Sequence, residues 1–350
     1  MTLPAYLASR ADRVADIPIL QPADPFLEVA GEDLRRRIFV TQGQDGTDLC
    51  LRPEFTIPVL RDALATGARG RFAVHGPVFR QDRDGAAEFA QAGIEDIGDT
   101  NTVAADARCL ADAHAALAAG GLRETRTVLG DDALFRALCQ ALDLPVPVTE
   151  RLERAFADAD RLRRTIEQFS AAQPAGGTSE EDAAAVRTRV EGLMSEASLP
   201  ATGGRTAQAI AERTVARARL GRYRLADRAR QALGALLSLD LPLVEASDAL
   251  DALCRDHAVD LTRERGAFRA RVEAMAAAGL DLAPIRYRGA FGRKLDYYSA
   301  LQFDIFAPGH EQPVAGGGRY DGLAALLGHA GPLPGVGFSI QLDRLAEVTA

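Results

Sequence analysis

The chain has 350 residues, of which 47% are hydrophobic and 26% charged, with a formal net charge of −8 and a pI near 5.3. This size and composition predict an ordinary soluble globular protein, built as one large domain with an insertion or as two domains. The acidic balance gives no general attraction to a phosphate backbone, so we do not expect nucleic-acid binding without a local basic patch.

The four cysteines are far apart and form no C-x-x-C pair, and no histidines stand at zinc-ligand spacing. They predict neither a disulfide framework nor a metal site, and they fit a reducing cytoplasm. The chain does not open with a basic segment followed by an apolar one, and it contains no run of about 18 apolar residues. We therefore expect a cytoplasmic protein with no membrane segment, metal or cofactor.

Short strands are predicted in the first hundred residues. Between residues 37 and 51, apolar runs flank an Asp-Gly pair, which predicts a hairpin of two antiparallel strands. Residues 72–75 and 92–97 have the length and flanking glycines of two more strands, and the polar residues 81–87 form the loop between them.

Helices dominate the middle of the chain. Apolar positions after Asp99 recur at helical spacing, residues 126–129 predict a strand, and Asp131 starts another helix. A long apolar stripe then predicts one helix between Thr149 and a proline-glycine break at 174–177. Pro200 to Gly204 forms a second break.

Strands return from Ile285, and two of them are predicted at 301–306 and 314–318 around a turn-rich connection. The whole pattern predicts an α+β fold with one antiparallel-sheet domain built from residues 1–130 and 281–350. A helical insertion over residues 131–280 interrupts this domain.

The strand after the polar loop could form one side of a binding site. Gln91, Gly93 and Glu95 point to the same face because side chains alternate along a strand. Gly93 would leave space there for a small polar ligand to lie against the backbone. Considered alone, paired glutamates are more often solvated, and a tyrosine pair such as Tyr297 and Tyr298 more often packs in a core.

Two further stretches are ambiguous. The glycines 316–318 do not form a P-loop and fit a tight turn from a strand into a helix. Residues 205–230 hold eight arginines against Glu212 and Asp227, a local net charge of +6. That stretch could contact tRNA, a nucleotide phosphate or an acidic partner, but we favour a solvated helical face or a partner contact, because only Tyr223 is present for base stacking.

Several segments together resemble the catalytic core of histidyl-tRNA synthetase, a class II aminoacyl-tRNA synthetase. They are Leu51-Arg52-Pro53-Glu54, Phe79-Arg80, Arg293-Lys294-Leu295-Asp296-Tyr297-Tyr298, the glycine-rich run 315–323, and residues 335–344. The resemblance covers about residues 15 to 130 and 280 to 350. It implies the class II fold, with an antiparallel sheet flanked by helices.

The resemblance also implies a histidine-binding site. Glu54, Thr56 and Gln91 would hold the α-amino group, and Glu95 and Tyr298 would reach the imidazole. Arg293 would face the carboxylate, while Tyr297 and Tyr320 would line the same pocket. A bound histidine needs acceptors, a cation and a planar hydrogen-bonding partner, which this set of side chains supplies.

Two arginines stand where the family contacts ATP phosphates, Arg80 in the second class II motif and Arg344 in the third. The loop after Arg80 carries one arginine against three carboxylates, which is poor chemistry for holding a phosphate chain. Arg80 could instead be a surface arginine paired with an aspartate, and Arg344 could lie on the exposed side of a final helix. We expect both to be vestigial phosphate-binding residues.

The chain ends six residues after Arg344, so we expect no anticodon-binding domain. Residues 55–59 and 128–138 resemble a paralogous family, the regulatory subunits of ATP phosphoribosyltransferase. That resemblance implies a subunit without chemistry of its own, which assembles with a short-form catalytic subunit at the first step of histidine biosynthesis and mediates feedback inhibition by histidine. It also implies a dimer, with an interface near residues 18–27.

Two other functions remain open from the sequence. An active histidyl-tRNA synthetase is supported by Arg80, Arg293 and Arg344 and by the arginine-rich stretch, and it predicts histidine-dependent ATP–pyrophosphate exchange. A paralogue that activates an amino acid for an acceptor other than tRNA would show exchange without tRNA charging.

Overall fold

The computed structural model describes residues 1–29, 31–81, 86–156, 158–170, 183–196, 206–293, 295 and 297–350. Both predicted breaks, at 174–177 and 200–204, lie outside the described residues, as does most of the loop predicted at 81–87.

A mixed nine-stranded sheet runs through the protein in the order β1-β5-β6-β12-β11-β10-β7-β9-β8. Its pairs are antiparallel from β5 to β7, whereas β1 is parallel to β5 and β7 is parallel to β9. A smaller antiparallel sheet has the order β2-β4-β3. The strands are β1 Arg13–Val14, β2 Leu20–Pro22, β3 Val40–Gln42, β4 Asp48–Leu51, β5 Gly70–Phe79, β6 Glu88–Ile97, β7 Arg126–Asp131, β8 Asp240–Pro242, β9 Ile285–Arg288, β10 Leu301–Phe306, β11 Ala315–Arg319 and β12 Gly335–Gln341.

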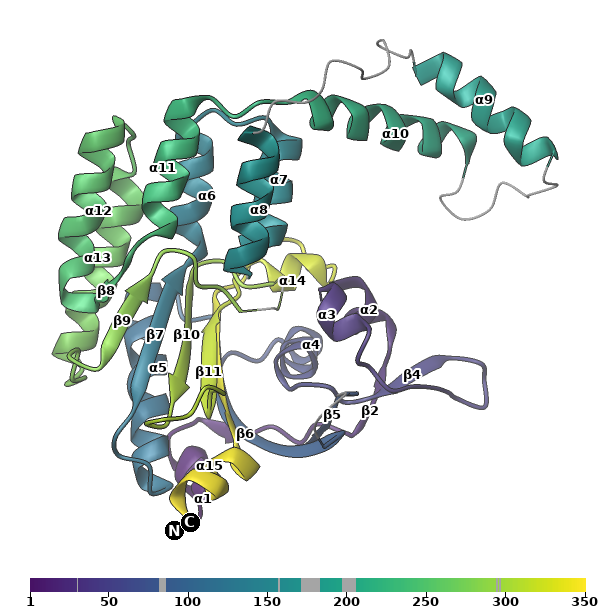
Figure 1. Ribbon diagram of the computed structural model, residues 1–350. Coiled ribbons are helices and arrows are strands. Elements are labelled where there is room, and N and C mark those ends of the chain that lie inside the picture. Colours follow the sequence, from purple (N-terminus) through teal and green to yellow (C-terminus); the bar gives the residue numbers. More distant parts are fainter. Residues whose placement is uncertain are drawn as a thin grey trace.

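Helices cover both faces of the large sheet (Figure 1). Helix α5 packs against β6, β11 and β12 on one face and is itself covered by α13, while α4 lies in the concave side of the sheet beside β6 and α14. The helices are α1 Leu3–Ser9, α2 Asp24–Val29, α3 Glu32–Arg35, α4 Thr56–Thr66, α5 Thr102–Ala119, α6 Asp132–Ala141, α7 Val146–Phe156, α8 Ala159–Ser170, α9 Ala183–Glu196, α10 Ala207–Arg222, α11 Asp227–Leu237, α12 Leu243–His257, α13 Thr262–Ala277, α14 Leu323–Leu326 and α15 Leu342–Thr349.

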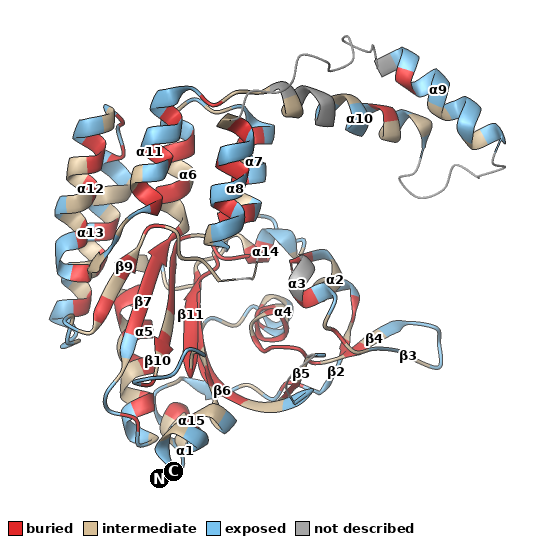
Figure 2. Cartoon of the chain, in the orientation of Figure 1, coloured by how far each residue is buried: buried red, intermediate tan, exposed pale blue. Residues whose placement is uncertain are grey.

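Two apolar clusters fill the space between these layers. The larger one joins α5 and the central strands to helices α6, α7, α8, α11, α12 and α13, and the smaller one surrounds α4 on the opposite face. The burial pattern in Figure 2 follows this arrangement, with buried central strands and outward helix faces exposed. The site described below lies on the α4 side of the sheet.

The predicted strands are confirmed. The hairpin forms as β3 and β4, the strand at 301–306 has the predicted bounds, and the two strands around the polar loop are longer than predicted, as β5 and β6. Asp131 starts α6 as predicted, because its carboxylate accepts the backbone N–H groups of Ala133 and Leu134 and so satisfies two free donors of the first turn.

The single helix predicted from Thr149 toward residue 173 is wrong. The apolar stripe is shared by two packed helices, α7 and α8. Asp158 interrupts the stripe, and its carboxylate accepts the N–H of Arg161, which starts a new helix. Helical periodicity continued through this break because the buried faces of both helices point into one core.

The helical middle of the chain is tied to the sheet. Strand β8, from within residues 131–280, is an edge strand of the large sheet, and α13 packs directly on α5. The predicted division into a sheet domain (1–130 and 281–350) and an insertion (131–280) stays a prediction.

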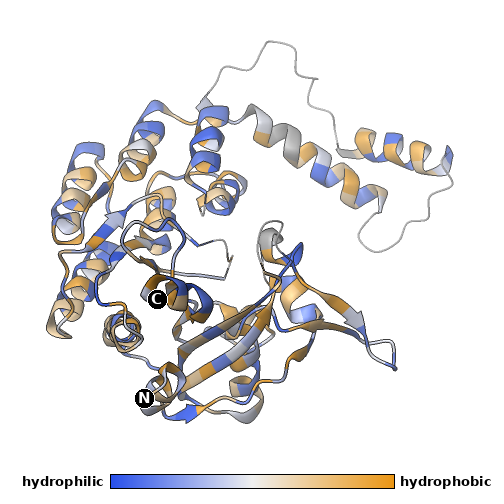
Figure 3. Ribbon diagram, turned by 60° about the horizontal axis from the view of Figure 1, so that its bottom comes forward, coloured by the Kyte–Doolittle hydropathy of each residue, from blue (hydrophilic) through white to orange (hydrophobic). Residues whose placement is uncertain are grey.

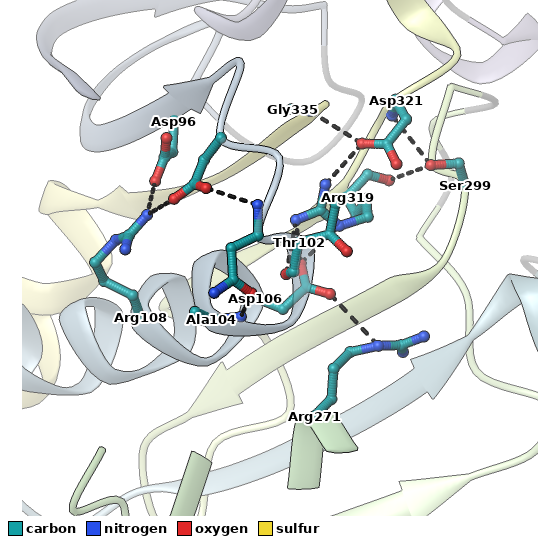
Figure 4. Close-up of polar contacts among 12 residues, drawn as sticks. Asp96, Thr102, Ala104, Asp106, Arg108, Arg271, Ser299, Arg319, Asp321 and Gly335 are labelled. Carbon is teal, nitrogen blue, oxygen red and sulfur yellow. Dashed lines mark hydrogen bonds and ion pairs between the residues drawn. The ribbon is translucent and has the colours of Figure 1, made fainter. Parts of the chain in front are cut away.

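A buried ion network joins the same parts (Figure 4). Asp106 of α5 forms an ion pair of 2.7 Å with Arg319 of β11 and one of 3.5 Å with Arg271 of α13. Arg271 also pairs with Asp131 at the end of β7. These four side chains are at most 9% exposed, so each charge depends on its partners.

Helices α9 and α10 extend from the body as a pair that pack mainly on each other (Figures 1 and 3). Three arginines of the stretch 205–230 bond within the chain. Arg228 donates to the carbonyls of His257 and Ala258 at the end of α12, Arg230 pairs with Asp227, and Arg224 donates to the carbonyl of Tyr223. Arg228 and Arg230 lie on α11, which fits the helical-surface interpretation, whereas Arg224 lies in the segment between α10 and α11.

Among the described residues, no helix combines the length and the apolar character needed to cross a bilayer. The four cysteines are buried free thiols, and within the described part of the chain no cluster of three metal-ligating side chains occurs.

Candidate functional site

All eight residues predicted to bind histidine line one cavity of about 450 Å³. The cavity lies between the start of α4, strands β6, β11 and β12, and the loop 291–299. Strands distant in sequence meet here because β6 pairs with β12 and β12 with β11. The eight residues are Glu54, Thr56, Gln91, Glu95, Arg293, Tyr297, Tyr298 and Tyr320.

Glu54 is held by the start of α4. Its carboxylate accepts the backbone N–H of Thr56 at 2.6 Å and that of Ile57 at 2.9 Å. It therefore satisfies donors that have no partner within the helix, and a carboxylate retains further lone pairs for a ligand. Burial raises its pKa, against the effect of these hydrogen bonds.

Glu95 is the most constrained carboxyl group of the cavity. Thr56 Oγ1 donates to one of its oxygens at 2.7 Å and the hydroxyl of Tyr320 donates to the other. Burial nevertheless raises the pKa of Glu95 to about 8, because desolvation of the charge outweighs both hydrogen bonds. Burial thus keeps this carboxyl largely protonated at neutral pH.

Gln91 lines the cavity with an amide that is open to it. The residue is only 3% exposed, and its amide makes no hydrogen bond to any residue that the structure describes. The amide atoms are not among the fully buried side-chain atoms that lack a partner, so they are accessible from the cavity. The amide is therefore available to bond a molecule there.

Three tyrosines form the aromatic wall. The ring of Tyr297 lies 5.0 Å from that of Tyr298 and 6.2 Å from that of Tyr320, the latter in an edge-to-face arrangement. All three are at most 8% exposed. These rings are buried, as in a core, and they also line the cavity.

Positive charge gathers opposite these groups. Arg293 pairs with Asp304, and its backbone N–H donates to Gln302 at 2.5 Å. Arg80 donates from Nε to the carbonyl of Pro53 at 2.7 Å. Among the described residues no carboxylate forms an ion pair with Arg80, and Arg37 lies on the same wall.

Two glycines make room for the charged side chains. A Cβ at Gly316 would overlap the Arg293 guanidinium and the Asp304 carboxylate, and one at Gly337 would overlap the Glu95 carboxylate. Gly316 lies within strand β11, so the expectation of a strand-to-helix turn for the glycine tract is wrong at this position.

The role expected for Gly93 is also wrong. The carbonyl oxygen of Phe338 on the neighbouring strand occupies the space that a side chain at Gly93 would need. This glycine therefore allows β12 to approach closely and does not make room for a ligand.

Arg344 is not among the residues that line the cavity. Its Nη1 donates to the carbonyl of Pro313 at 2.9 Å, and Pro313 is itself part of the wall. Arg80 and Arg344 therefore occupy different positions relative to the cavity, one on its wall and one behind it.

Sequence reasoning missed Arg37, Gln302 and Asp304. Gln302 and Asp304 alternate with the buried residues Leu301, Phe303 and Ile305 in β10. Because side chains alternate along a strand, this pattern could have placed the two polar residues on the face of the site. No comparable signal marks Arg37, which reaches the cavity only through the tertiary fold.

The arrangement suits a small zwitterion with a planar ring. Carboxylates and an open amide can accept from an ammonium group, guanidinium groups can bind a carboxylate, and tyrosine rings can enclose a flat group.

Comparison with known proteins relates the whole chain to two sets of proteins. The histidyl-tRNA synthetase family profile matches residues 13–188 and 188–345. An ATP phosphoribosyltransferase regulatory subunit of Mesorhizobium japonicum is 45% identical over 97% of this chain and 94% of its own length. A protein of the same name from Brucella anthropi is 44% identical over 98% of this chain and 95% of its own.

Solved structures agree on the fold. A protein from Bacillus halodurans, described as an ATP phosphoribosyltransferase regulatory subunit/histidyl-tRNA synthetase, superposes with a TM-score of 0.72 at 19% identity, covering 99% of this chain and 77% of that one. Histidyl-tRNA synthetase from Nostoc sp. PCC 7120 gives 0.66 at 13% identity, covering 99% and 69%. The class II synthetase-like α+β fold is thus confirmed.

Proposed function

Since the chain belongs to the family of ATP phosphoribosyltransferase regulatory subunits, we propose that it binds histidine and transmits its presence to a catalytic subunit at the first step of histidine biosynthesis. In this function the cavity is an effector site, and the chain itself transfers no phosphoribosyl group. The partner would be a short-form ATP phosphoribosyltransferase catalytic subunit.

The observation that carries this proposal is the composition of the cavity. The eight predicted side chains line it together, and buried Gln91 is left with an unused amide. Gln91, Glu54 and Thr56 would hold the α-amino group, Arg293 the carboxylate, and Glu95 and Tyr298 the imidazole. Tyr297 and Tyr320 would enclose the ligand.

Binding must change the balance between two arrangements of the complex to act as feedback inhibition. A ligand with equal affinity for both arrangements shifts nothing. We infer that the state with histidine bound is the less active one, and that Arg80 and Arg344 serve no catalytic step.

Isothermal calorimetry on the purified chain tests histidine binding. We expect binding that Gln91→Leu weakens by at least about tenfold, because the ligand loses a buried hydrogen-bond partner. Gln140→Leu, on the exposed end of α6, is the control and should leave the affinity unchanged. Histidine-dependent ATP–pyrophosphate exchange by the chain would contradict the proposal and favour an active synthetase.

We also propose that the chain forms a dimer through the smaller sheet. Ile19, Leu20 and Val40 are 42%, 52% and 53% exposed there, around β2 and β3. Leu20 and Val40 lie on the two outer strands of this sheet, and exposed apolar side chains favour association. Light scattering on the chain as it elutes from a gel-filtration column should give twice the monomer mass. Leu20→Glu should reduce the measured mass.

A further inference from the structure

A second cleft lies directly behind the loop that closes the candidate histidine site. It has a volume of about 480 Å³ and lies between that loop, α6, α7 and α14. Five residues line both spaces, so the loop is a wall shared by the cleft and the cavity. These residues are Gly292, Arg293, Leu295, Tyr297 and Tyr298.

The shared wall is fastened from the cleft side. Arg136 of α6 donates to the carbonyl of Tyr298 at 3.0 Å. The side chain of Gln302 donates to Asp132 at 2.6 Å and accepts the backbone N–H of Arg293 at 2.5 Å. A molecule in the cleft would therefore act on the groups that position Arg293 and Tyr298 in the neighbouring cavity.

Among the described residues, the cleft has no unpaired positive charge. Its far wall carries Asp132, Glu150 and Glu153, and all three of its arginines are already paired. Arg293 pairs with Asp304, which is not part of the cleft. Arg136 lies 3.3 Å from Asp132 and 4.0 Å from Glu153, at the limit of an ion pair, and Arg154 lies 3.7 Å from Glu150. The three carboxylates of the far wall thus share two guanidinium groups.

The pKa values of two of these acids are raised. Burial raises the pKa of Asp132 to about 7 and also raises that of Glu153, although Arg136 opposes both shifts. A cation entering the cleft would be stabilised by these carboxylates and would lower both values again.

Apolar surface accompanies the acids. The rings of Phe135 and Phe156 stack with centroids 4.5 Å apart on the inner wall. At the rim, Leu326 of α14 is 57% exposed, and the side chain of Glu150 is exposed to the same extent. A basic side chain next to an apolar one on a protein surface complements this combination of charge and shape.

We propose that this cleft docks a basic segment of the catalytic partner subunit, with a lysine or arginine facing Glu150 and Glu153 and an apolar residue over Leu326. The inference rests on the proposed function for the existence of that partner. Docking here would couple the two sites through their shared wall. By linkage, histidine and the partner would change each other's affinity by the same factor.

The test measures assembly of the full chain with a short-form catalytic subunit by calorimetry or sedimentation. Leu326→Glu and Glu150→Lys change exposed side chains, so both should fold like the wild type. We expect each to raise the Kd for the partner by about tenfold or more. Val244→Glu and Glu245→Lys are the matched controls on exposed positions of α12, and they should leave the Kd unchanged.

Histidine binding by the chain alone separates the two proposals. The wild-type chain could assemble with its partner and bind histidine while both cleft variants keep the wild-type Kd for the partner. That result would overturn the docking inference and leave the proposed function intact. A wild-type chain that neither assembles nor binds histidine would overturn both. If Leu326→Glu changes the mass measured for the chain without its partner, the cleft binds a second copy of this chain. That result would also overturn the inference.

Discussion

Glu95 links the candidate site to the pH dependence of stability. Its pKa is raised by burial to about 8 in the folded chain, whereas an unfolded glutamate titrates near about 4.3. Between these values the folded chain holds a proton that the unfolded chain releases. Its contribution to stability is therefore fully present below the unfolded pKa and is lost as pH rises toward 8.

Glu95→Gln should flatten this dependence, because glutamine does not titrate. Between about pH 5 and about pH 8, the free energy of unfolding should fall less in the variant, by on the order of 3 kcal/mol. Urea titrations at several pH values measure this difference in the free energy of unfolding. The pKa of Asp132 is also raised, so the free energy of unfolding still depends on pH to some extent in both proteins. If the free energy of unfolding depends on pH equally in the variant and the wild type, Glu95 is not a buried, protonated group.

Gly316 determines where Arg293 lies. In Gly316→Ala the new methyl group would overlap the Arg293–Asp304 pair, so Arg293 must leave the position in which it faces the cavity. We expect the Kd for histidine to rise by about tenfold or more, measured by calorimetry. The control is Gly266→Ala on the open surface of α13, which should stabilise by up to about 1 kcal/mol and leave histidine affinity unchanged.

Much of the site was predictable residue by residue, and the limits have physical causes. Motif order placed Gln91, Glu95 and Arg293 together, although they come from β6 and a loop 200 residues later. It could not show that both oxygens of Glu54 accept amides of α4. It also could not show that the backbone of β12 fills the space at Gly93, because register across a sheet depends on tertiary pairing.

At the scale of elements, α13 is held to the sheet by charge as well as by apolar packing. Arg271 is 7% exposed, pairs with Asp131 and shares Asp106 with Arg319. Figure 4 shows Asp106 between the two arginines. Arg271→Leu would leave two buried carboxylates short of a partner. We expect a loss of about 3–5 kcal/mol in the free energy of unfolding, measured by urea denaturation.

Arg269, two positions earlier in the same helix, is the matched control. Its side chain is 50% exposed and pairs with Asp251 at 2.9 Å. Arg269→Leu should cost at most about 1 kcal/mol, because solvent screens an exposed pair. Equal losses in the two variants would show that burial of the network does not determine its contribution.

Element boundaries were predictable where one local signal dominates. Asp131 starts α6 because its carboxylate caps the helix, and β10 ends where its alternation ends. The break at Asp158 was missed because the apolar period continues across it. The edge strand β8 was missed because three residues give too short a pattern, and pairing with β9 creates the strand.

At the scale of the molecule, the proposed effector cavity and the acidic cleft lie on two sides of one loop. The loop residues Arg293 and Tyr298 face the cavity, while their backbone groups are held by Gln302 and Arg136 from the cleft side. A regulator needs such a connection between its ligand and its partner, because differential contact is the only means by which a ligand shifts an equilibrium.

The most direct test is the turnover of the assembled ATP phosphoribosyltransferase complex as histidine is added, with the wild-type chain and with Gln91→Leu. We expect histidine to inhibit the wild-type complex, and we expect the variant complex to need about tenfold more histidine for the same inhibition. Inhibition at the same histidine concentration in both complexes would place the effector site elsewhere and contradict the account.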